Sequence, residues 1–343
     1  MDSTTISSAP SVNETQEDIN YIDYFDKEEC FAIRYDETCK NLAAGYSTGF
    51  LGIYDFEIPE SSLDYRKTYN ISTFPITCVR WKPLNKTTLI AVTADGNIIQ
   101  VHSKSGKILQ KLKEDNPLMC VDYSPDGTFF ATGGDDKVVR LYDDNTKTLI
   151  TKLQTHKYNL PEHSNRIFAV KFSKKDPNLL LSSGWDNTIL LYDLRAKEVQ
   201  DHLYGPHVCG DGLDIKDDLL LTASWAKEDQ IQLFDLRNRK RIGVFQMILD
   251  NEKRNSLDNI SYLYSCRFNP VNTTFCVTGS KKNYLRIYDY TNLNNNELTE
   301  ERIKGILDLK DLNEPCYCCD YNLKGNKLAY GCAKSNVNFL NLK

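Results

Sequence analysis

A short unit that returns seven times along the chain limits the possible folds more than any other feature. Its clearest copy spans 167–195, where polar turns separate three short apolar runs: Ile167–Phe172, Leu179–Ser183 and Thr188–Asp193. The third run closes on an aromatic residue followed by aspartate, Tyr192-Asp193. Apolar runs of this length, with turn residues between them, are typical of antiparallel strands.

The closing pair returns every 41 to 54 residues. The copies are Tyr54-Asp55, Tyr142-Asp143, Tyr192-Asp193, Phe234-Asp235 and Tyr288-Asp289, with two weaker ones at Val101-His102 and Phe339-Leu340. The first runs are also alike, at 30–35, 76–81, 118–123, 167–172, 264–268 and 316–321, whereas the fifth unit has the aberrant GDGLDI at 210–215. The second runs end in small residues, as at 43–45 and 131–133. Such a period signals a propeller or solenoid, because one unit cannot bury its apolar face alone.

These motifs resemble those of the WD-repeat family. His163, Asp186 and Tyr192-Asp193 fall on the family's His…Asp…Trp-Asp pattern, although Tyr or Phe replaces Trp and the usual opening Gly-His pair is absent. The resemblance covers about residues 20–343. It implies an all-β fold, a single seven-bladed β-propeller of four-stranded antiparallel blades. It also implies structural roles within the repeats for His163, Asp95, Asp136, Asp186 and Tyr192.

Two segments are expected, a flexible tail at 1–18 and one propeller domain at 19–343. The tail is Ser-, Thr-, Asn- and acid-rich and has few apolar anchors. The seventh unit supplies only three strands, and an open ring would expose two sheet edges. We therefore expect about Ile22–Asp26 to be an N-terminal strand that completes the last blade and closes the ring. The alternative is an unstructured leader.

Composition narrows the classes of partner. A net charge of −5 and a pI near 5.7 argue against nucleic acid as the main direct partner. Neither a membrane-spanning apolar run nor a signal-peptide layout is present in the sequence. We expect an intracellular protein without a membrane partner, in the cytoplasm rather than the nucleus.

Eleven cysteines raise the question of metal or redox chemistry. Most of them stand where other repeats have a small buried residue, as Cys78, Cys120 and Cys318 do. The cluster at 316–319 lacks the paired spacing of zinc sites. We expect packing roles and no cofactor; a metal or redox role is the alternative.

The sequence contains no catalytic motif that we recognise. It has no phosphate-binding glycine loop, no His-Glu-x-x-His and no Gly-x-Ser-x-Gly. Its carboxylates occupy turn positions, where aspartate bonds its own backbone. His163 could be a general base, but its repeat position favours a buried partner of a turn Asp or Ser. No cluster of acids and histidines is seen to converge on the central channel, and we expect a protein that is not an enzyme.

Two tryptophans indicate a partner site. Trp185 and Trp225 follow the second strands of adjacent repeats, which places them near the channel mouth on the narrow face. Together with Arg166, Lys227 and Lys281-Lys282, they have the composition of an interface hot spot. The alternative is that each tryptophan packs between neighbouring turns. Inserts at 155–165 and 246–261 should extend the same face. We predict protein partners, bound mainly through the narrow face and these inserts.

A second feature resembles the Asp-x-Arg box with which some WD-repeat proteins dock on the damaged-DNA-binding adaptor of cullin-type ubiquitin ligases. The matching pairs are Asp193 with Arg195 and Asp235 with Arg237. Plain salt bridges on neighbouring turns would explain the same residues. The basic run 237–241 is interpreted as a solvated turn, with a nuclear-import or acidic-partner patch as its alternative. The favoured function is a non-enzymatic scaffold within a cytoskeletal, ciliary or RNA-processing assembly; the alternatives are a ubiquitin-ligase substrate receptor and an enzyme hosted on a propeller.

Overall fold

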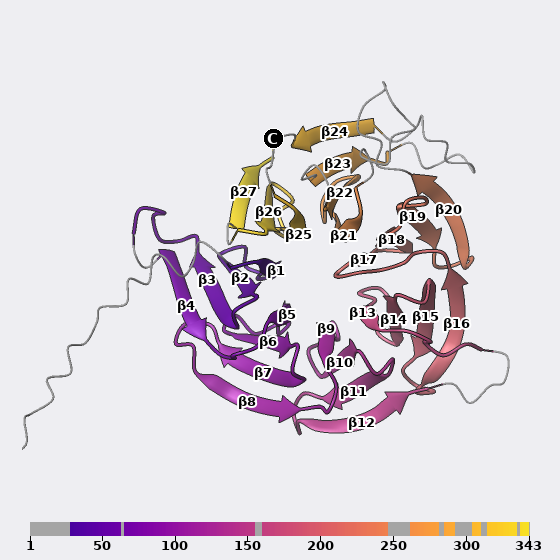
Figure 1. Ribbon diagram of the computed structural model, residues 1–343, viewed down its shortest axis with the longest axis horizontal. Helices are drawn as coiled ribbons and strands as arrows, with labels where there is room; N and C mark the ends of the chain where they lie inside the picture. Colours follow the sequence, from indigo (N-terminus) through magenta and orange to yellow (C-terminus); the bar gives the residue numbers. More distant parts are fainter. Residues whose placement is uncertain are drawn as a thin grey trace, which may run out of the picture.

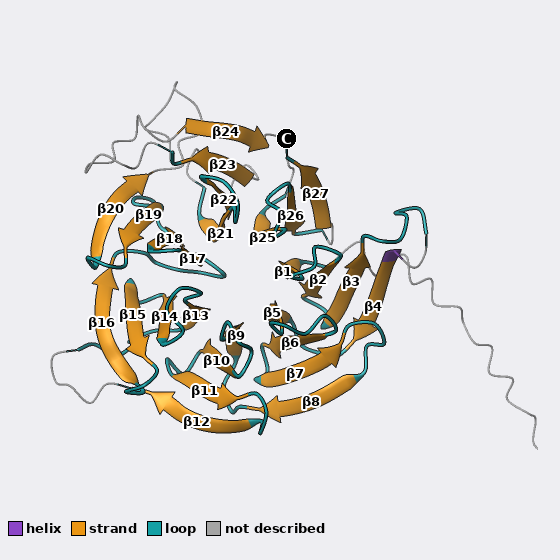
Figure 2. Ribbon diagram, turned by 180° about the vertical axis from the view of Figure 1, so that it is seen from behind, coloured by secondary structure: helices purple, strands orange, loops and turns teal. Residues whose placement is uncertain are grey.

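The computed structural model is a ring of antiparallel sheets. It describes residues 28–62, 65–154, 160–245, 261–280, 285–291, 304–309, 314–334 and 337–342. Seven sheets follow one another around a central axis in chain order (Figure 1). In the described part the elements are strands and loops, with a 3₁₀ residue at Tyr65 just before β4 (Figure 2). The predicted all-β, seven-bladed propeller is confirmed.

Each blade begins with its innermost strand and ends with its outermost. Blade 1 contains β1 (Cys30–Tyr35), β2 (Asn41–Tyr46), β3 (Phe50–Asp55) and β4 (Arg66–Asn70); blade 2 contains β5 (Ile76–Trp81), β6 (Thr88–Thr93), β7 (Asn97–His102) and β8 (Ile108–Lys113). Blade 3 contains β9 (Leu118–Tyr123), β10 (Phe129–Gly134), β11 (Val139–Asp143) and β12 (Thr148–Leu153); blade 4 contains β13 (Ile167–Phe172), β14 (Leu179–Gly184), β15 (Thr188–Asp193) and β16 (Glu198–Tyr204). Blade 5 contains β17 (Leu213–Lys216), β18 (Leu219–Ala223), β19 (Ile231–Asp235) and β20 (Lys240–Phe245). Blade 6 contains β21 (Leu263–Phe268), β22 (Thr274–Gly279), β23 (Leu285–Asp289) and β24 (Lys304–Leu309), and blade 7 contains β25 (Cys316–Tyr321), β26 (Lys327–Cys332) and β27 (Val337–Asn341).

The core lies between the blades. Among the described residues, seven hydrophobic clusters each join one blade to the next, from the junction of blades 1 and 2 to that of blades 7 and 1. Second strands such as β14 are buried along their whole length, whereas the outermost β8 is mostly exposed. Burial of both faces of the inner strands explains their continuous apolar runs, because no face is left for solvent.

The small residues at the ends of the second strands let neighbouring blades approach closely. A Cβ atom on Gly45 would lie 2.5 Å from Ile76 Cγ2 of blade 2. A Cβ atom on Gly133 would lie 2.8 Å from Ile167 Cγ2 of blade 4. In both cases the first residue of the next innermost strand fills the space above the glycine. The same arrangement joins the last blade to the first, since a Cβ atom on Gly331 would lie 2.7 Å from Cys30 Sγ.

The ring closes through side chains of blades 7 and 1. Asp320 Oδ2 accepts a 2.8 Å hydrogen bond from the backbone N–H of Tyr35. The Cys318 thiol donates to the carbonyl oxygen of Cys30 at 3.4 Å. Within the described residues the last sheet has three strands, in the order β25-β26-β27. The strand expected at 22–26 and the tail expected at 1–18 both lie outside the described residues.

Candidate partner-binding site at the centre of the ring

A collar of half-buried side chains surrounds the axis where the innermost strands begin. We call this side of the ring the upper face; it also carries the turns between second and third strands. The second residue of the innermost strand stands at a register shift in blades such as 1, 2, 4, 6 and 7. The collar residues are Phe31, Thr77, Met119, Phe168, Asp211, Tyr264 and Tyr317. A bulged residue turns away from the ladder, so these side chains are free to line an opening instead of packing in a sheet.

Aromatic rings join much of this collar to the neighbouring turns. Tyr317 contacts Phe31 at 5.5 Å and Tyr264 at 5.2 Å between ring centroids, which links blades 1, 7 and 6. Farther round, Phe168 stacks on Trp185 at 5.1 Å, and Trp225 lies 4.8 Å from Tyr262. We call this set the aromatic arc: Phe31, Tyr317, Tyr264, Tyr262, Trp225, His207, Trp185 and Phe168.

The two tryptophans singled out from the sequence are both in the arc, in different environments. Trp185 is half-buried between Phe168 and His207, whose ring lies 5.9 Å away. The Arg166 guanidinium lies 5.6 Å from the centre of the Trp185 ring and is ion-paired with Asp135. Trp225 is 37% exposed. Each tryptophan therefore packs on a neighbour and still offers surface, which combines the two alternatives.

Of the three lysines in the predicted hot spot, the structure describes one. Lys227 is exposed on the turn that follows Trp225. Lys281 and Lys282 lie outside the described residues, as do 155–159 and 246–260 of the two inserts. The described part of the first insert, 160–165, reaches the upper face beside Arg166.

The repeat residues of blade 4 form a buried hydrogen-bonded chain. His163 Nδ1 lies 2.7 Å from Asp186 Oδ2, and Nε2 lies 2.6 Å from Ser182 Oγ, which is 3.0 Å from the Tyr192 hydroxyl. Because a carboxylate only accepts, Nδ1 donates to Asp186 Oδ2. Burial raises the pKa of Asp186, but the hydrogen bond and charge of His163 and the backbone N–H groups of Ser164 and Thr188 together outweigh burial, so the net shift of that pKa is downward. This arrangement supports a structural role for His163.

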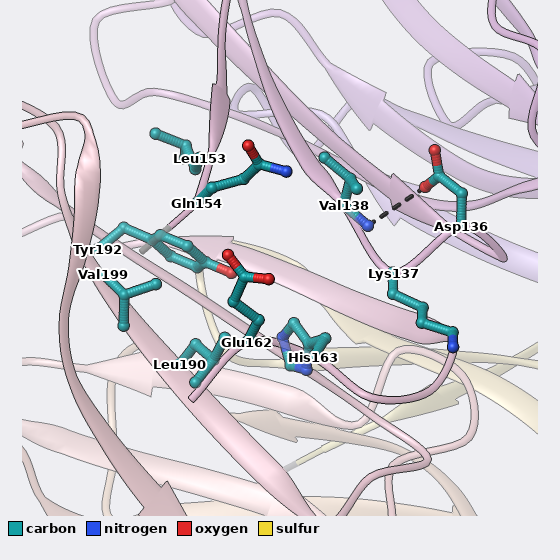
Figure 3. Close-up of a pocket in the computed structure, with 10 residues that line it drawn as sticks. All are labelled: Asp136, Lys137, Val138, Leu153, Gln154, Glu162, His163, Leu190, Tyr192 and Val199. Carbon is teal, nitrogen blue, oxygen red and sulfur yellow. Dashed lines mark hydrogen bonds between the residues drawn. The ribbon is translucent and has the colours of Figure 1, made fainter. Parts of the chain in front are cut away.

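The turn aspartates of blades 2 and 3 bond partners within their own blades. Asp95 accepts from Thr93 Oγ1 at 2.5 Å and pairs with Lys113 at 3.1 Å. Asp136 accepts from the backbone N–H of Val138 at 3.2 Å and pairs with Arg140 (Figure 3). A cavity of about 180 Å³ lies next to this turn, between blades 3 and 4. Its lining residues are Asp136, Lys137, Val138, Leu153, Gln154, Glu162, His163, Leu190, Tyr192 and Val199.

The two arginines of the possible adaptor boxes fold back on their own turns. Arg195 Nη2 lies 2.7 Å from Asp193 Oδ2, and Arg237 Nη2 lies 3.1 Å from Asp235 Oδ2. The hydrogen bonds from Arg195 lower the pKa of Asp193 to about 2. Both arginine side chains remain largely exposed, 71% for Arg195. Their plain salt bridges therefore leave them accessible on the face opposite the aromatic arc.

Charged side chains occupy one repeat position at the centre of the ring, and the sequence analysis missed them. The next-to-last residue of each of the seven first runs is charged and at least partly buried: Arg34, Arg80, Asp122, Lys171, Asp214, Arg267 and Asp320. Comparison of the seven first runs at this position would have found them. We call this set the charged ring. The acids of the ring each face a cation rather than a histidine.

Neighbouring blades pair their charges in a regular way. Arg80 Nε contacts Asp122 at 3.0 Å, Lys171 Nζ contacts Asp214 at 3.0 Å, and Arg267 Nε contacts Asp320 at 3.6 Å. Each pair joins a cation to the aspartate of the following blade. Burial raises the pKa of Asp320 to about 6, and the Arg267 charge counteracts that rise. Paired charges of this kind hold blades in register, because removal of one partner leaves the other charge buried and uncompensated.

Most of the cysteines are buried. The eleven cysteines are free thiols, and Cys78, Cys120 and Cys318 are buried in the innermost strands. In the described ranges, no three His, Cys, Asp or Glu side chains are grouped so that they could hold a metal ion. The same ranges contain no helix with the length and apolar character needed to cross a membrane.

Comparison with known proteins agrees with the architecture. The family model described as "WD domain, G-beta repeat" matches residues 106–143 and 154–193, which cover parts of blades 2 to 4. The chain is a seven-bladed β-propeller, and the segments that match the family model show that it contains WD repeats, as the sequence predicts.

The relatives have varied names. Protein sof1 of Schizosaccharomyces pombe is 29% identical over 112 residues, which cover 33% of this chain and 24% of that protein. Histone acetyltransferase type B subunit 2 of Candida glabrata is 23% identical over 168 residues, or 48% of this chain and 39% of that protein. Eukaryotic translation initiation factor 3 subunit I of Candida albicans is 26% identical over 105 residues, or 31% of this chain and 30% of that protein. The matched segments thus span less than half of each relative.

Proposed function

We propose that the protein is a non-enzymatic interaction scaffold, a subunit of a larger intracellular assembly that binds protein partners through the aromatic arc. Cytoskeletal, ciliary and RNA-processing assemblies are the types we favour, in the cytoplasm rather than the nucleus. The observation that carries the proposal is the arc itself, with Trp225 37% exposed on the upper face of the ring. Two relatives that are named as subunits of other assemblies support a scaffold role.

The arc has the chemistry of a binding surface. Tryptophan and tyrosine supply large contact area at low entropic cost, and they dominate the energetics of many interfaces. Arg166 and Lys227 flank the rings with donors for backbone carbonyls or carboxylates of a partner. A ring of packed blades holds these side chains in place before binding, which reduces the ordering cost of association.

The test compares partner capture by wild-type protein with capture by Trp225→Ala and Trp185→Ala. Captured proteins are quantified by mass spectrometry, and the Tm of each variant is measured in parallel. We expect Trp225→Ala to lose the specific partners by about tenfold or more, as hot-spot truncation does, with little change in Tm. Trp185→Ala should lose partners as well, with a larger fall in Tm because its ring is stacked on both sides.

A matched control is available on the outside of the ring. Tyr204, on the outermost strand β16, is 62% exposed. Tyr204→Ala should keep every partner. Full capture by the Trp225 variant, or equal loss with the Tyr204 variant, would remove the arc as the binding surface.

The substrate-receptor function is the second candidate. Its support is that Arg195 and Arg237 occupy the same exposed turn in adjacent blades 4 and 5. The double change Arg195→Glu with Arg237→Glu should abolish capture of the damaged-DNA-binding adaptor and leave arc-dependent partners in place. Absence of that adaptor from the wild-type capture would eliminate this function.

A further inference from the structure

The charged ring has an odd number of members, so its pairing cannot be complete. The three cation–aspartate pairs use blades 2 to 7. Arg34 of blade 1 is the seventh member, and the next blade presents Arg80 rather than an aspartate. A buried guanidinium requires a counter-charge, since its desolvation is otherwise costly.

Asp211 supplies that counter-charge from across the ring. Its Oδ2 atom lies 2.8 Å from Arg80 Nη2 and 2.5 Å from Arg267 Nη2, and it is also ion-paired with Arg34 Nη2. One carboxylate oxygen from blade 5 thus meets arginines from blades 1, 2 and 6. Arg267 Nη1 further donates to the carbonyl oxygens of Asp211 and Leu213, at 3.3 and 3.1 Å.

The aberrant fifth repeat is what brings Asp211 to this place. Gly210 has φ +110, and a Cβ atom there would lie 2.8 Å from the Tyr264 carbonyl oxygen. A Cβ atom on Gly212 would lie 2.7 Å from the Ala223 carbonyl oxygen. Glycine on both sides therefore permits a backbone path that other residues would block. As a result β17 begins only at Leu213, and Asp211 lies before it as a member of the collar.

We propose that Arg34, Arg80 and Arg267 form a carboxylate-binding cradle, that Asp211 is its resident internal ligand, and that an acidic side chain of a protein partner bound at the aromatic arc exchanges with Asp211. The proposal deepens the scaffold function and rests on it.

Exposure supports exchange at this position. The Asp211 side chain is 18% exposed, whereas the three arginine side chains are 4–9% exposed. The carboxylate is therefore the member of the cluster nearest to solvent, and it lies at collar level beside Tyr264, whose backbone carbonyl faces Gly210. Arginine is also the residue best suited to carboxylate recognition, because its fork of donors matches the two oxygens.

Charge balance explains why the cradle exchanges its ligand rather than standing empty. With Asp211 in place, the charged ring and Asp211 together hold four cations and four carboxylates. Withdrawal of Asp211 alone would leave one uncompensated positive charge among buried groups, which is strongly unfavourable. An incoming carboxylate restores the balance, so a partner that presents aspartate or glutamate at the arc is favoured over a neutral one.

Chemical rescue tests the cradle directly. Asp211→Ala removes a group the size of formate, so its Tm should fall by several degrees, and sodium formate should raise it in a saturable way. Sodium chloride at equal ionic strength should not do so. Asp211→Asn keeps the volume and loses the charge, so it should be destabilised without rescue. Asp95→Ala, which removes a turn carboxylate on another hairpin, should not respond to formate either.

If Asp211→Ala does not fold in chloride, recovery of folded protein by refolding in formate is the same rescue. Failure of formate to act on Asp211→Ala beyond its effect on wild-type protein would overturn the cradle.

A peptide pair tests the exchange. A fluorescent peptide of alternating glutamate and glycine should bind Asp211→Ala at least tenfold more tightly than wild-type protein, because it no longer competes with the internal carboxylate. The glutamine version should not distinguish the two proteins, and adding Arg34→Ala to the variant should remove the gain.

Formate rescue without glutamate selectivity would overturn the exchange and leave Asp211 as a structural counter-ion. Failure of the scaffold function itself appears elsewhere, in partner capture by the Trp225 and Tyr204 variants.

Discussion

Asp320 in the last blade accepts a 2.8 Å hydrogen bond from the backbone N–H of Tyr35 in the first blade. The same bond links Asp122 to Phe172 at 2.9 Å and Asp214 to Phe268 at 2.8 Å. In all three, the aspartate of the charged ring reaches the residue that follows the next blade's charged position. The junction of blades 7 and 1 therefore has the same aspartate-to-backbone hydrogen bond as the junctions of blades 3 and 4 and of blades 5 and 6. Substitution of Asp320 consequently tests how the ring closes.

The pH dependence of stability should reveal Asp320. Burial raises its pKa to about 6, above the value near 3.8 for the free side chain. The folded state then binds this proton more tightly than the unfolded state does. The resulting stabilisation is complete below about pH 4 and is lost as the pH rises through 6, a change of about 3 kcal/mol at most.

Urea unfolding of wild-type protein and Asp320→Asn at pH 4 and 7 measures this effect. The free energy of unfolding of the wild type, minus that of the variant, should be larger at pH 4. A difference that grows towards pH 7 would mean that ion pairing to Arg267 outweighs burial.

Asp186 should be the most costly turn aspartate to remove. Its carboxylate accepts from His163 Nδ1 at 2.7 Å and from the backbone N–H of Ser164 at 3.0 Å. Asp186→Ala leaves these donors without their partner in a buried site, and should lower the free energy of unfolding by about 2–4 kcal/mol. Denaturant titration measures the loss. Asp115→Ala, at an exposed position, serves as the control and should change little; equal effects would show that the blade 4 hydrogen-bonded chain contributes nothing special.

Replacement of Gly331 by a residue with a side chain should destabilise the protein, because the thiols of Cys30 and Cys318 fill the space beside it. A Cβ atom there would lie 2.7 Å from both Cys30 Sγ and Cys318 Sγ. Gly331→Ala should destabilise the protein by about 1–3 kcal/mol, as overpacking of a filled core does. Adding Cys318→Ala should recover part of the loss, and thermal unfolding of the double-mutant cycle measures the coupling. Strict additivity of the two changes would refute contact at this junction.

Arg195 should control the titration of Asp193 without supporting the fold. Its hydrogen bonds lower the pKa of Asp193 to about 2. In Arg195→Ala that pKa should rise towards its ordinary value near 3.8, as followed by NMR of the carboxyl carbon, while the Tm stays unchanged because the pair is exposed. Arg237→Ala should leave Asp193 unaffected and act on Asp235 instead. An unmoved Asp193 pKa in the Arg195 variant would show that the backbone bonds of the turn are sufficient.

The blades could be predicted because each is encoded locally. The packing of one blade on its neighbour requires particular residues at fixed places in each repeat. Examples are the aromatic–aspartate ending Tyr192-Asp193 and the small residue Gly133. The positions of Trp185 and Trp225 followed from the same register. Their exposure did not, because it depends on rings supplied by other strands, such as Phe168 and Tyr262.

The charged ring could have been found, but its pairing could not. The charged residue stands next to last in each of the seven first runs, so comparison across the repeats contains the signal. By contrast, Arg80 and Asp211 are 131 residues apart and belong to blades that are not adjacent. They meet because the ring of blades closes around a common centre. Taken alone, the sequence GDGLDI resembles a degenerate repeat and does not indicate that Asp211 binds arginines of other blades.

Closure between Cys30 and Cys318 has a consequence for synthesis on the ribosome, because the two residues are separated by 288 positions. At typical translation rates of about 5–20 residues per second, the face of blade 1 that includes Ile33 and Leu42 waits roughly 15–60 s for its cover. During that interval the apolar face of blade 1 in the nascent chain is exposed and can associate with other unfolded chains. Correct folding in the cell therefore depends on how quickly blade 7 is synthesised. Chaperones that cover the exposed face of blade 1 should raise the yield of folded protein.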